Sequence, residues 1–520
     1  MLTVPIDVTI QKACLGLLFC FLTHYVWKVL ESPLNSIPGP FLAKWTNLWR
    51  LFDVWGGRCE LTQKLLHEKY GPVVRLGPNC VSVGRPDPNL IAKLYGIKGD
   101  CLKTNFYHSN SVFQDGDIIY TLFSETNNVR HAQMKRPIAQ IYSPNGVRAL
   151  EPHIDKTISC FTRRLKQEFI MGEKDKICDL DRWLSYYSWD AVGEVTFSNP
   201  FGFLEKATDV GKTMMASERS LDYFALVGQM PFLDFIFDKN PIVRVINRAF
   251  KLGLGFNFIT EMSINCLQER RTGKDNHGAS SPDFLDKFLE AQTKHPDTVD
   301  NNMVISYLLN NMIAGADTTA ITLRSVFYYI LKNAQVYREL QSEIDSSGIS
   351  IPVAYQDVRS LAYLDAVIRE AMRMHPGVGM PLERYAPEGG LHAFGYHIPE
   401  GVKVGMNPWV TSADRDVFGS DAEDFRPERW LQQKGETKQD YDARRKRMNR
   451  CDLTFGAGRR ICIGKDLAQL NICKVVAAIM LEFEMQLADP KQEWKIQNSW
   501  FVRQEGVNVR LSPRKNAWPH

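Results

Sequence analysis

The sequence FGAGRRICIG, residues 455–464, places a single cysteine, Cys462, shortly after two arginines and among glycines. A thiol binds a metal ion only as the thiolate, and nearby arginines and backbone N–H groups favour that form. Glycine permits close approaches that other residues do not, so a flat cofactor could lie against this main chain. An amphipathic helix is predicted over 465–485, and the dipole at its N-terminus also favours a negative charge on Cys462. The stretch therefore predicts a thiolate that binds a metal or a cofactor.

The chain has eleven cysteines, an odd number, scattered without C-x-x-C pairs. This pattern is typical of neither a disulfide framework nor a zinc site. The other ten cysteines are therefore expected to be small packing residues or part of the N-terminal segment, in a reducing compartment. Cys462 is the exception that carries a functional prediction.

The cysteine stretch reproduces the pattern F-x-x-G-x-R-x-C-x-G, and it resembles the haem-binding loop of cytochrome P450 enzymes. The matching residues are Phe455, Gly458, Arg460, Cys462 and Gly464. The resemblance implies that Cys462 is the axial thiolate ligand of the haem iron, which favours O–O bond cleavage. It also implies that Arg460 pairs with a haem propionate, and that Phe455 and Gly458 belong to the cofactor-binding loop.

A second motif lies upstream, inside a long apolar stretch. AGADTT, residues 314–319, resembles the family's motif A/G-G-x-D/E-T-T/S. Gly315 weakens a helix, and a threonine hydroxyl can bond back to a carbonyl one turn earlier, which opens a groove. The resemblance implies that Asp317 and Thr318 are catalytic and supply a proton route. Taken alone, Asp-Thr-Thr in a helix more often has no catalytic role, because its side chains face solvent or bond back to the helix backbone.

Two further motifs fit the same family. Glu370 and Arg373, in EAMR, stand one helical turn apart just before a proline that ends the helix. FRPERW, residues 425–430, is similar to the family's P-E-R-F/W segment. The resemblance implies a buried Glu370–Arg373–Arg429 network. Its expected role is structural, because it orders the loop that leads to Cys462.

The resemblance also places cofactor-binding cations elsewhere in the chain. Arg384, in PLERYAP, stands where the family commonly has a propionate-binding arginine, and a surface arginine is the alternative. The family often has W-x-x-x-R earlier in the chain, but this sequence has His131 and Lys135 at those positions. Both can donate to a propionate, lysine as a point charge without the bidentate fork of arginine. Arg136 is a further alternative.

Composition and periodicity bound the fold. A hydrophobic share of 44% and a charged share of 23% are those of a globular protein with an ample core. Strand-like alternation is confined to short stretches near 72–84, 392–407 and 500–513. The predicted fold class is mainly α with small β-sheets, and the resemblance implies the cytochrome P450 fold behind an N-terminal transmembrane helix. Helices are predicted over 60–70, 125–142, 147–169, 178–195, 210–225, 241–271, 283–294, 301–346 and 355–374.

The N-terminal segment is predicted to be a membrane anchor. Residues 8–30 are largely apolar, approach the roughly 20 residues that a bilayer needs, and carry polar side chains near both ends. A cleaved signal peptide is the alternative, but no A-x-A-like site follows the apolar run. Basic residues downstream favour a cytosolic catalytic part, in a single-pass protein of the endoplasmic reticulum. The expected organisation is an anchor at 1–31, a proline-rich hinge at 32–40 and a haem-thiolate catalytic domain at 41–520.

The resemblance implies a haem-thiolate monooxygenase that inserts one oxygen atom of O₂ into a hydrophobic small molecule, by hydroxylation or oxidative dealkylation. The start of the globular part resembles fungal microsomal members, especially the pisatin-demethylase-like group of secondary metabolism. The expected cofactor is haem b. No nucleotide-binding fingerprint occurs, so electrons are expected from NADPH through a partner NADPH–cytochrome P450 reductase, with cytochrome b5 as an additional donor.

Charge and apolar content indicate the other partners. ARRKRMNR, residues 443–450, holds five basic residues that suit an acidic reductase, and a solvated charge run is the alternative. A net charge of +4, without a long basic run interleaved with aromatics, argues against nucleic acid. A terpenoid is the first substrate hypothesis, ahead of polyketide, phenolic and indole compounds. The expected pocket segments are 106–123, 221–237, 305–316, 378–380 and 500–501.

Two other functions stay open at this point. A haem-thiolate isomerase or dehydratase would act on a peroxide, and the acid–threonine pair argues against it. A non-enzymatic haem protein would carry electrons or sense a gas, and the apolar substrate segments argue against that.

Overall fold

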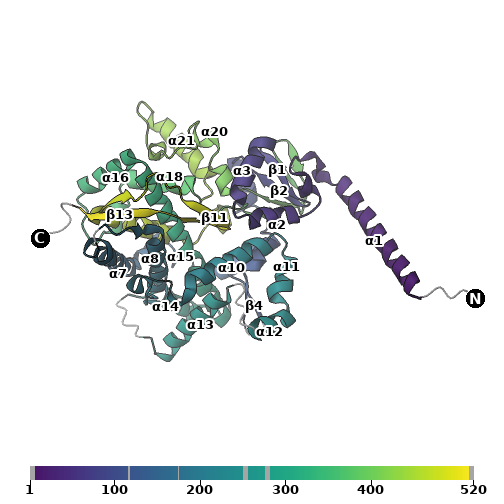
Figure 1. The fold of residues 1–520 in the computed structure, drawn as a ribbon, viewed down its shortest axis with the longest axis horizontal. Coiled ribbons are helices and arrows are strands. Elements are labelled where there is room, and N and C mark those ends of the chain that lie inside the picture. Colours follow the sequence, from purple (N-terminus) through teal and green to yellow (C-terminus); the bar gives the residue numbers. More distant parts are fainter. Residues whose placement is uncertain (1–5, 115–116, 174, 250–255, 276–280, 515–520) are drawn as a thin grey trace, which may run out of the picture.

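The computed structural model describes residues 6–114, 117–173, 175–249, 256–275 and 281–514. Helices dominate and the sheets are small (Figure 1). The predicted fold class is thereby confirmed. The helices are α1 (Ile6–Leu30), α2 (Leu48–Trp55), α3 (Cys59–Tyr70), α4 (Pro88–Tyr95), α5 (Asn128–Lys135), α6 (Pro144–Arg148), α7 (Glu151–Leu165), α8 (Leu180–Phe197), α9 (Phe203–Lys206), α10 (Thr213–Val227), α11 (Phe232–Asp234), α12 (Pro241–Ala249), α13 (Asn257–Thr272), α14 (Phe284–Lys294), α15 (Asn301–Lys332), α16 (Ala334–Ser346), α17 (Tyr355–Val358), α18 (Ala362–Met374), α19 (Pro408–Thr411), α20 (Arg415–Phe418), α21 (Lys438–Cys451) and α22 (Lys465–Glu482).

The strands form one four-stranded sheet, one three-stranded sheet and three two-stranded pairs within the described residues. The strands are β1 (Val73–Gly77), β2 (Cys80–Val83), β3 (Val112–Gln114), β4 (Asp117–Ile119), β5 (Cys178–Asp179), β6 (Arg384–Tyr385), β7 (Leu391–Ala393), β8 (Tyr396–Ile398), β9 (Lys403–Gly405), β10 (Phe483–Leu487), β11 (Lys495–Ser499), β12 (Phe501–Glu505) and β13 (Asn508–Pro513). The larger sheet has the order β1-β2-β9-β6, in which β2 and β9 run parallel. The strands predicted near the C-terminus exist, but β12 pairs with β11, whereas β13 pairs with β10 and β5.

Several predicted helices prove to be two elements or shorter ones. The stretch 301–346 breaks at Asn333, whose side chain caps α16 by accepting from the Val336 N–H at 3.2 Å. The helix predicted over 465–485 ends at Glu482, and β10 follows. The stretch 241–271 contains α12 and α13, while residues 250–255 between them lie outside the described residues.

Helix α15 is the central element, and it lies along α8, α18 and α22. Its 32 residues are apolar around most of the circumference, which is the pattern of a helix buried on all sides. In α8, seventeen of the eighteen residues are buried. This packing fixes the position of the 314–319 motif relative to the C-terminal half of the chain.

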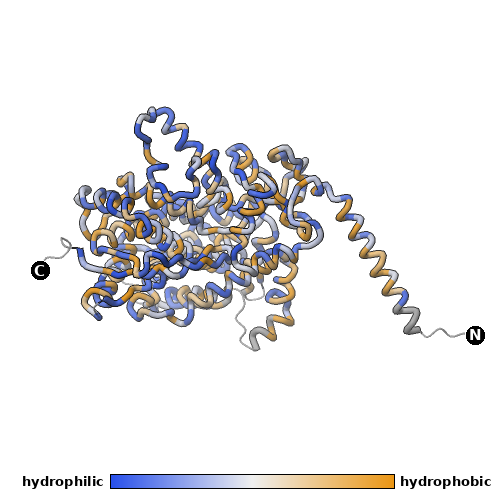
Figure 2. The backbone as a smooth tube through the Cα atoms, turned by 45° about the horizontal axis from the view of Figure 1, so that its top comes forward, coloured by the Kyte–Doolittle hydropathy of each residue, from blue (hydrophilic) through white to orange (hydrophobic). Residues whose placement is uncertain are grey.

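Helix α1 projects from the body (Figures 1 and 2). The side chains of its residues 12–30 are largely exposed. Residues 12–30 have a mean hydropathy of 1.6 and form the one helix, among the described residues, that is long and apolar enough to cross a membrane. The following segment is docked rather than free: Leu34 and Ile37 are buried in the core beside the β1–β2 sheet. The chain therefore leaves the body near residue 31.

Candidate active site

The cysteine loop is closed by its own backbone. The Cys462 N–H donates to the Phe455 carbonyl at 2.8 Å, and helix α22 begins three residues after the cysteine. Gly456 and Gly458 have φ angles of 69° and 60°, which favour glycine. A Cβ on Gly458 would lie 1.9 Å from the Tyr95 carbonyl oxygen, so this glycine is required by packing against α4. Gly458, expected at the cofactor, does not line the cavity described next.

An internal cavity of about 320 Å³ separates the cysteine loop from α15, a volume within the range of small-molecule sites. Cys462 lines this cavity and is exposed toward it. Phe455 lines the same wall, and Ala314 and Thr318 lie on the α15 side. All five pocket segments predicted from the sequence contribute lining residues, including Tyr107, Leu221, Leu309, Val378 and Trp500.

The groups that favour the Cys462 thiolate are not the two arginines expected from the sequence. Burial raises the pKa of the Cys462 thiol, while the Gly464 N–H, Lys135 and Lys465 act in the opposite direction. The two arginines before the cysteine are not among these groups, because their guanidinium groups are held elsewhere: Arg459 donates to the Ile97 carbonyl and Arg460 to the Glu125 carbonyl. Lys135, Lys465 and the Gly464 N–H, rather than the two arginines, therefore favour the thiolate form.

The α15 motif forms the opposite wall as an unbroken helix. The Thr318 hydroxyl donates to the Ala314 carbonyl and the Thr319 hydroxyl to the Gly315 carbonyl, both at 2.7 Å, which matches the predicted back-bonding. A Cβ on Gly315 would lie 2.9 Å from Val192 Cγ2, so close packing against α8 requires glycine there. Thr318, Thr319 and Gly315 all line the cavity.

Asp317 points away from the cavity, unlike its neighbour. Its carboxylate accepts a hydrogen bond of 2.7 Å from the Ser217 hydroxyl of α10, and Asp317 is not among the lining residues. Burial raises the pKa of Asp317, opposed by Ser217 and by the charges of Arg503 and Arg324. The acid–threonine pair is therefore split across the helix, with the hydroxyl inside and the carboxyl behind it.

Four of the predicted cofactor-binding residues line one region of the cavity: His131, Lys135, Arg384 and Arg460. Arg460 donates to the Glu125 carbonyl at 2.7 Å and to Asn128 Oδ1 at 3.0 Å. Arg384, in β6, is buried and donates to the Glu383 carbonyl at 2.8 Å.

His131 and Lys135, which replace the family's usual Trp/Arg pair, differ in how burial and neighbouring charges affect their pKa values. Burial, together with Arg460 and Lys103, lowers the pKa of His131 to about 3, so His131 is a neutral donor. Burial also lowers the pKa of Lys135, which the Cys462 thiolate would raise and Arg460 lowers further. Arg136 is exposed and does not line the cavity.

Sequence reasoning missed Lys103, a buried lysine on the same wall. No motif surrounds it in CLKTNFYHSN. Its location follows from a long-range backbone pairing, because Lys103 forms an isolated antiparallel bridge with Arg384. The local sequence therefore contains no signal for it.

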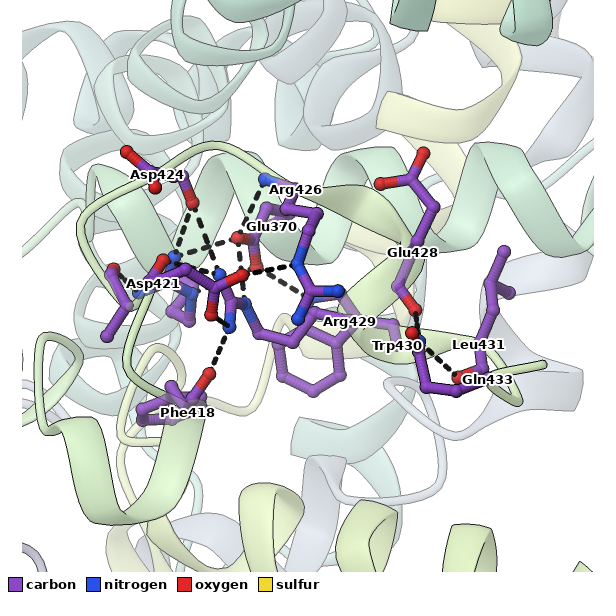
Figure 3. Close-up of polar contacts among 12 residues, drawn as sticks. Glu370, Phe418, Asp421, Asp424, Arg426, Glu428, Arg429, Trp430, Leu431 and Gln433 are labelled. Atoms are coloured by element: carbon purple, nitrogen blue, oxygen red, sulfur yellow. Dashed lines mark hydrogen bonds and ion pairs between the residues drawn. The ribbon is translucent and has the colours of Figure 1, made fainter. Parts of the chain in front are cut away.

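Glu370, Arg373 and Arg429 form ion pairs in the structure, and Figure 3 shows Glu370 beside Arg429. Glu370 is fully buried and accepts from Arg373 at 2.7 and 2.9 Å and from Arg429 at 3.1 Å. Arg429 also pairs with Asp421 at 2.6 Å. Burial alone would raise the pKa of Glu370, but Arg373 and Arg429 outweigh it and hold that pKa below its usual value.

These residues fit a haem held by a thiolate. One wall presents an accessible cysteine thiol, the opposite wall is an apolar helix with threonine hydroxyls, and the edge carries cationic side chains without carboxylate partners among the described residues. Cations gathered at one edge suit the propionates of haem, and apolar walls suit its ring.

Comparison with known proteins agrees with this geometry. The cytochrome P450 family model matches residues 38–510, and the chain belongs to that family. It is similar to "Cytochrome P450 monooxygenase cfoH" of Aspergillus candidus, with 41% identity over 504 residues, 96% of this chain and 92% of the relative. It is also similar to "Cytochrome P450 monooxygenase cicH" of Emericella nidulans, with 37% identity over 490 residues, 93% and 95% of the two chains. The predicted family, enzyme class and haem-thiolate type are confirmed at this level.

Proposed function

We propose that the protein is a membrane-anchored haem-thiolate monooxygenase that inserts one oxygen atom of O₂ into a hydrophobic small molecule. The observation that carries the proposal is the Cys462 thiol facing Thr318 across one apolar cavity. When bound, haem would supply the oxygen-activating chemistry, and the Cys462 thiolate would hold its iron as an electron-rich ligand. The chain's own residues bind and orient the reactants around this centre.

Each wall has a distinct task in the proposed reaction. Arg384 and Arg460, which line the cavity, would hold the haem propionates at its cationic edge. Thr318 holds a proton at Oγ1 inside the cavity, and Asp317 exchanges protons from behind the helix, through its contact with Ser217. The apolar lining excludes water from the reacting atoms.

The substrate wall is aromatic. Tyr107, Phe123, Phe224 and Trp500 line the cavity. Phe106 does not line it but packs against this group, and the paired rings have centroids 4.9 to 5.9 Å apart. Such a wall favours an apolar substrate with a flat or ring-containing body. A terpenoid remains the first hypothesis, and polyketide, phenolic and indole compounds belong in the same test panel.

Electron supply is proposed to come from NADPH through a flavoprotein reductase, with cytochrome b5 as an additional donor. Helix α21 carries the basic run and packs against α4, which also contacts the turn Gly458–Arg460 of the cysteine loop. Lys446, Arg447 and Arg450 are exposed, whereas Arg444 is tied to Glu436 at 2.7 Å. The exposed three suit an acidic partner near the thiolate side.

The proposed location is the endoplasmic reticulum membrane, crossed once by residues 1–31, with the catalytic domain in the cytosol. The apolar, exposed helix α1 supports this proposal. The proposed catalytic domain, 41–520, is preceded by the segment 32–40, which packs onto the β1–β2 sheet.

The test is expression in microsomes with a reductase, NADPH and a panel of hydrophobic metabolites. A monooxygenase gives a red-shifted carbonyl band in the ferrous protein and NADPH-dependent O₂ consumption with oxygenated products. Cys462→Ala should abolish both. A carbonyl band without O₂ consumption would favour an isomerase, a dehydratase or a non-enzymatic haem protein, and activity retained in Cys462→Ala would refute the proposal.

A further inference from the structure

Most buried cations of this protein have partners. Seven lysine and arginine side chains are buried in the part of the chain that the structure describes. Arg75 donates to four neutral oxygen atoms, and four others pair with carboxylates: Arg50, Arg373, Arg429 and Lys474. The remaining two, Lys103 and Arg384, both line the cavity. Their printed acceptors are neutral and fewer than those of Arg75: the Phe123 carbonyl for Lys103, and the Glu383 carbonyl and the Tyr107 hydroxyl for Arg384. A buried charge without a counter-ion is costly, so this pair indicates a missing anion.

The surroundings of Lys103 stabilise a cation but do not neutralise it. Its side chain is 7% exposed. The ammonium donates to the Phe123 carbonyl and lies 4.0 and 4.3 Å from the ring centroids of Tyr107 and Phe123. An ammonium has three donors, and aromatic faces attract it without forming an ion pair. No carboxylate among the described residues pairs with Lys103.

The charges near Lys103 increase the excess of positive charge at this edge of the cavity. Burial lowers the pKa of Lys103 well below its usual value, and Arg384 and Arg460 lower it further. Glu125 acts in the opposite direction, but its carboxylate already accepts from the Asn127 N–H at 2.7 Å and pairs with Arg130 at 3.2 Å. One edge of the cavity thus carries several cations and no free carboxylate from the described chain.

We propose that Lys103 binds a carboxylate inside the cavity, beside Arg384. The inference rests on the proposed function, because the carboxylate comes either from a haem propionate or from an acid group on the substrate. The backbone bridge between Lys103 and Arg384 supports it, since it holds both cations at the same edge. Lys103 would then complete the set that His131, as a neutral donor, cannot complete.

The first experiment measures haem transfer from the purified ferric protein to excess apomyoglobin, without substrate or reductase. The variants are Lys103→Met, which removes the charge, Lys103→Arg, which keeps it, and Lys98→Met, an exposed control in the same region. If the carboxylate is a propionate, Lys103→Met loses haem about tenfold faster, and the two others behave as the wild type.

The second experiment titrates the ferric haem band with 1-naphthoic acid and with its methyl ester. If the carboxylate belongs to the substrate, the wild type prefers the acid, and Lys103→Met shifts the acid-to-ester ratio by about tenfold at an unchanged haem transfer rate. Lys103→Arg retains the preference.

The proposal is overturned if haem transfer is unchanged in Lys103→Met and the acid preference is either absent in the wild type or retained in the variant. Failure of the proposed function gives a different result. The wild type would then lack the thiolate-type carbonyl band, which is recorded before either titration.

Discussion

Replacing Glu370 with glutamine tests the buried ion-pair network that Glu370 forms with Arg373 and Arg429. The carboxylate accepts five hydrogen bonds, from two groups of Arg373 and from the Arg426 N–H, the Arg429 Nε and the Trp430 indole. Glutamine removes the charge and turns one acceptor into a donor that faces donors (Figure 3). At least two of the five hydrogen bonds are lost in either orientation of the amide.

The expected loss of stability depends on which arginine loses its only carboxylate partner. Arg429 keeps its ion pair with Asp421, but Arg373 has no second carboxylate among the described residues. Removing one partner of a buried pair costs about 3–5 kcal/mol. Unfolding entropy for a chain of 520 residues is on the order of 1 kcal/mol per degree, so the melting temperature should fall by about 3–5 °C.

Circular dichroism and the haem band, followed during heating of the purified holoprotein, measure this change. Asp421→Asn is the matched control, since Asp421 also pairs with Arg429 but its side chain is 30% exposed, and a loss of at most about 1 kcal/mol is expected. A Glu370→Gln variant that melts no lower than Asp421→Asn would refute the reasoning.

The pH dependence has a definite sign. Because the pKa of Glu370 is lowered in the folded protein, its stabilising effect is present above the usual carboxyl pKa and is lost as pH falls through the lower, folded value. The difference in melting temperature between wild type and Glu370→Gln should therefore shrink toward strongly acid pH. A difference that grows on acidification would contradict the ion-pair explanation.

Three further predictions concern catalysis, electron supply and the membrane. Asp317→Asn should lower product formation about 10²-fold and flatten its pH profile. Ser217→Ala removes only the hydrogen bond to Asp317, so it should shift the pH profile instead. If both variants form as much product per NADPH as the wild type, Asp317 has no role in proton delivery. Lys446→Glu with Arg447→Glu should slow reductase-supported turnover at low salt and match the wild type at high salt, measured by stopped-flow reduction. Deleting residues 2–31 should move the protein to the soluble fraction with an intact carbonyl band; loss of the band would show that the anchor also supports the fold.

Local sequence was sufficient to predict the parts of the site whose residues must stand at a fixed spacing along the chain. Cys462 and Phe455 stand seven residues apart because one backbone hydrogen bond closes the loop between them. Glu370 and Arg373 are adjacent on one helical turn, and a third partner, Arg429, is added by the packing of a recognisable segment. Patterns of this kind are visible in a single chain, since each depends on neighbours in sequence or on a fixed motif.

Two kinds of feature were not predicted from the sequence: a helix boundary marked by a single residue, and contacts that arise from tertiary packing. Apolar periodicity continues through Asn333, so the break between α15 and α16 is marked only by a capping side chain that sequence reasoning treated as part of one helix. The sequence interpretation connected Gly458 with a cofactor and Gly315 with a weakened helix, whereas in the structure a Cβ at Gly458 would meet the Tyr95 carbonyl and a Cβ at Gly315 would meet Val192. Each of the two glycine contacts joins segments more than a hundred residues apart.

The distribution of charge around the cavity has a consequence for folding. The described chain neutralises Arg373, Arg429 and Lys474 with its own carboxylates, but it leaves Lys103 and Arg384 for an anion that arrives from outside. A ligand that binds only the folded state stabilises that state by mass action. Binding of the anion at the edge of the cavity should therefore stabilise the folded state of the segments around it. Cofactor loss should loosen the segments that carry Lys103 and Arg384 before it affects the Glu370 network, which contains its own counter-ions.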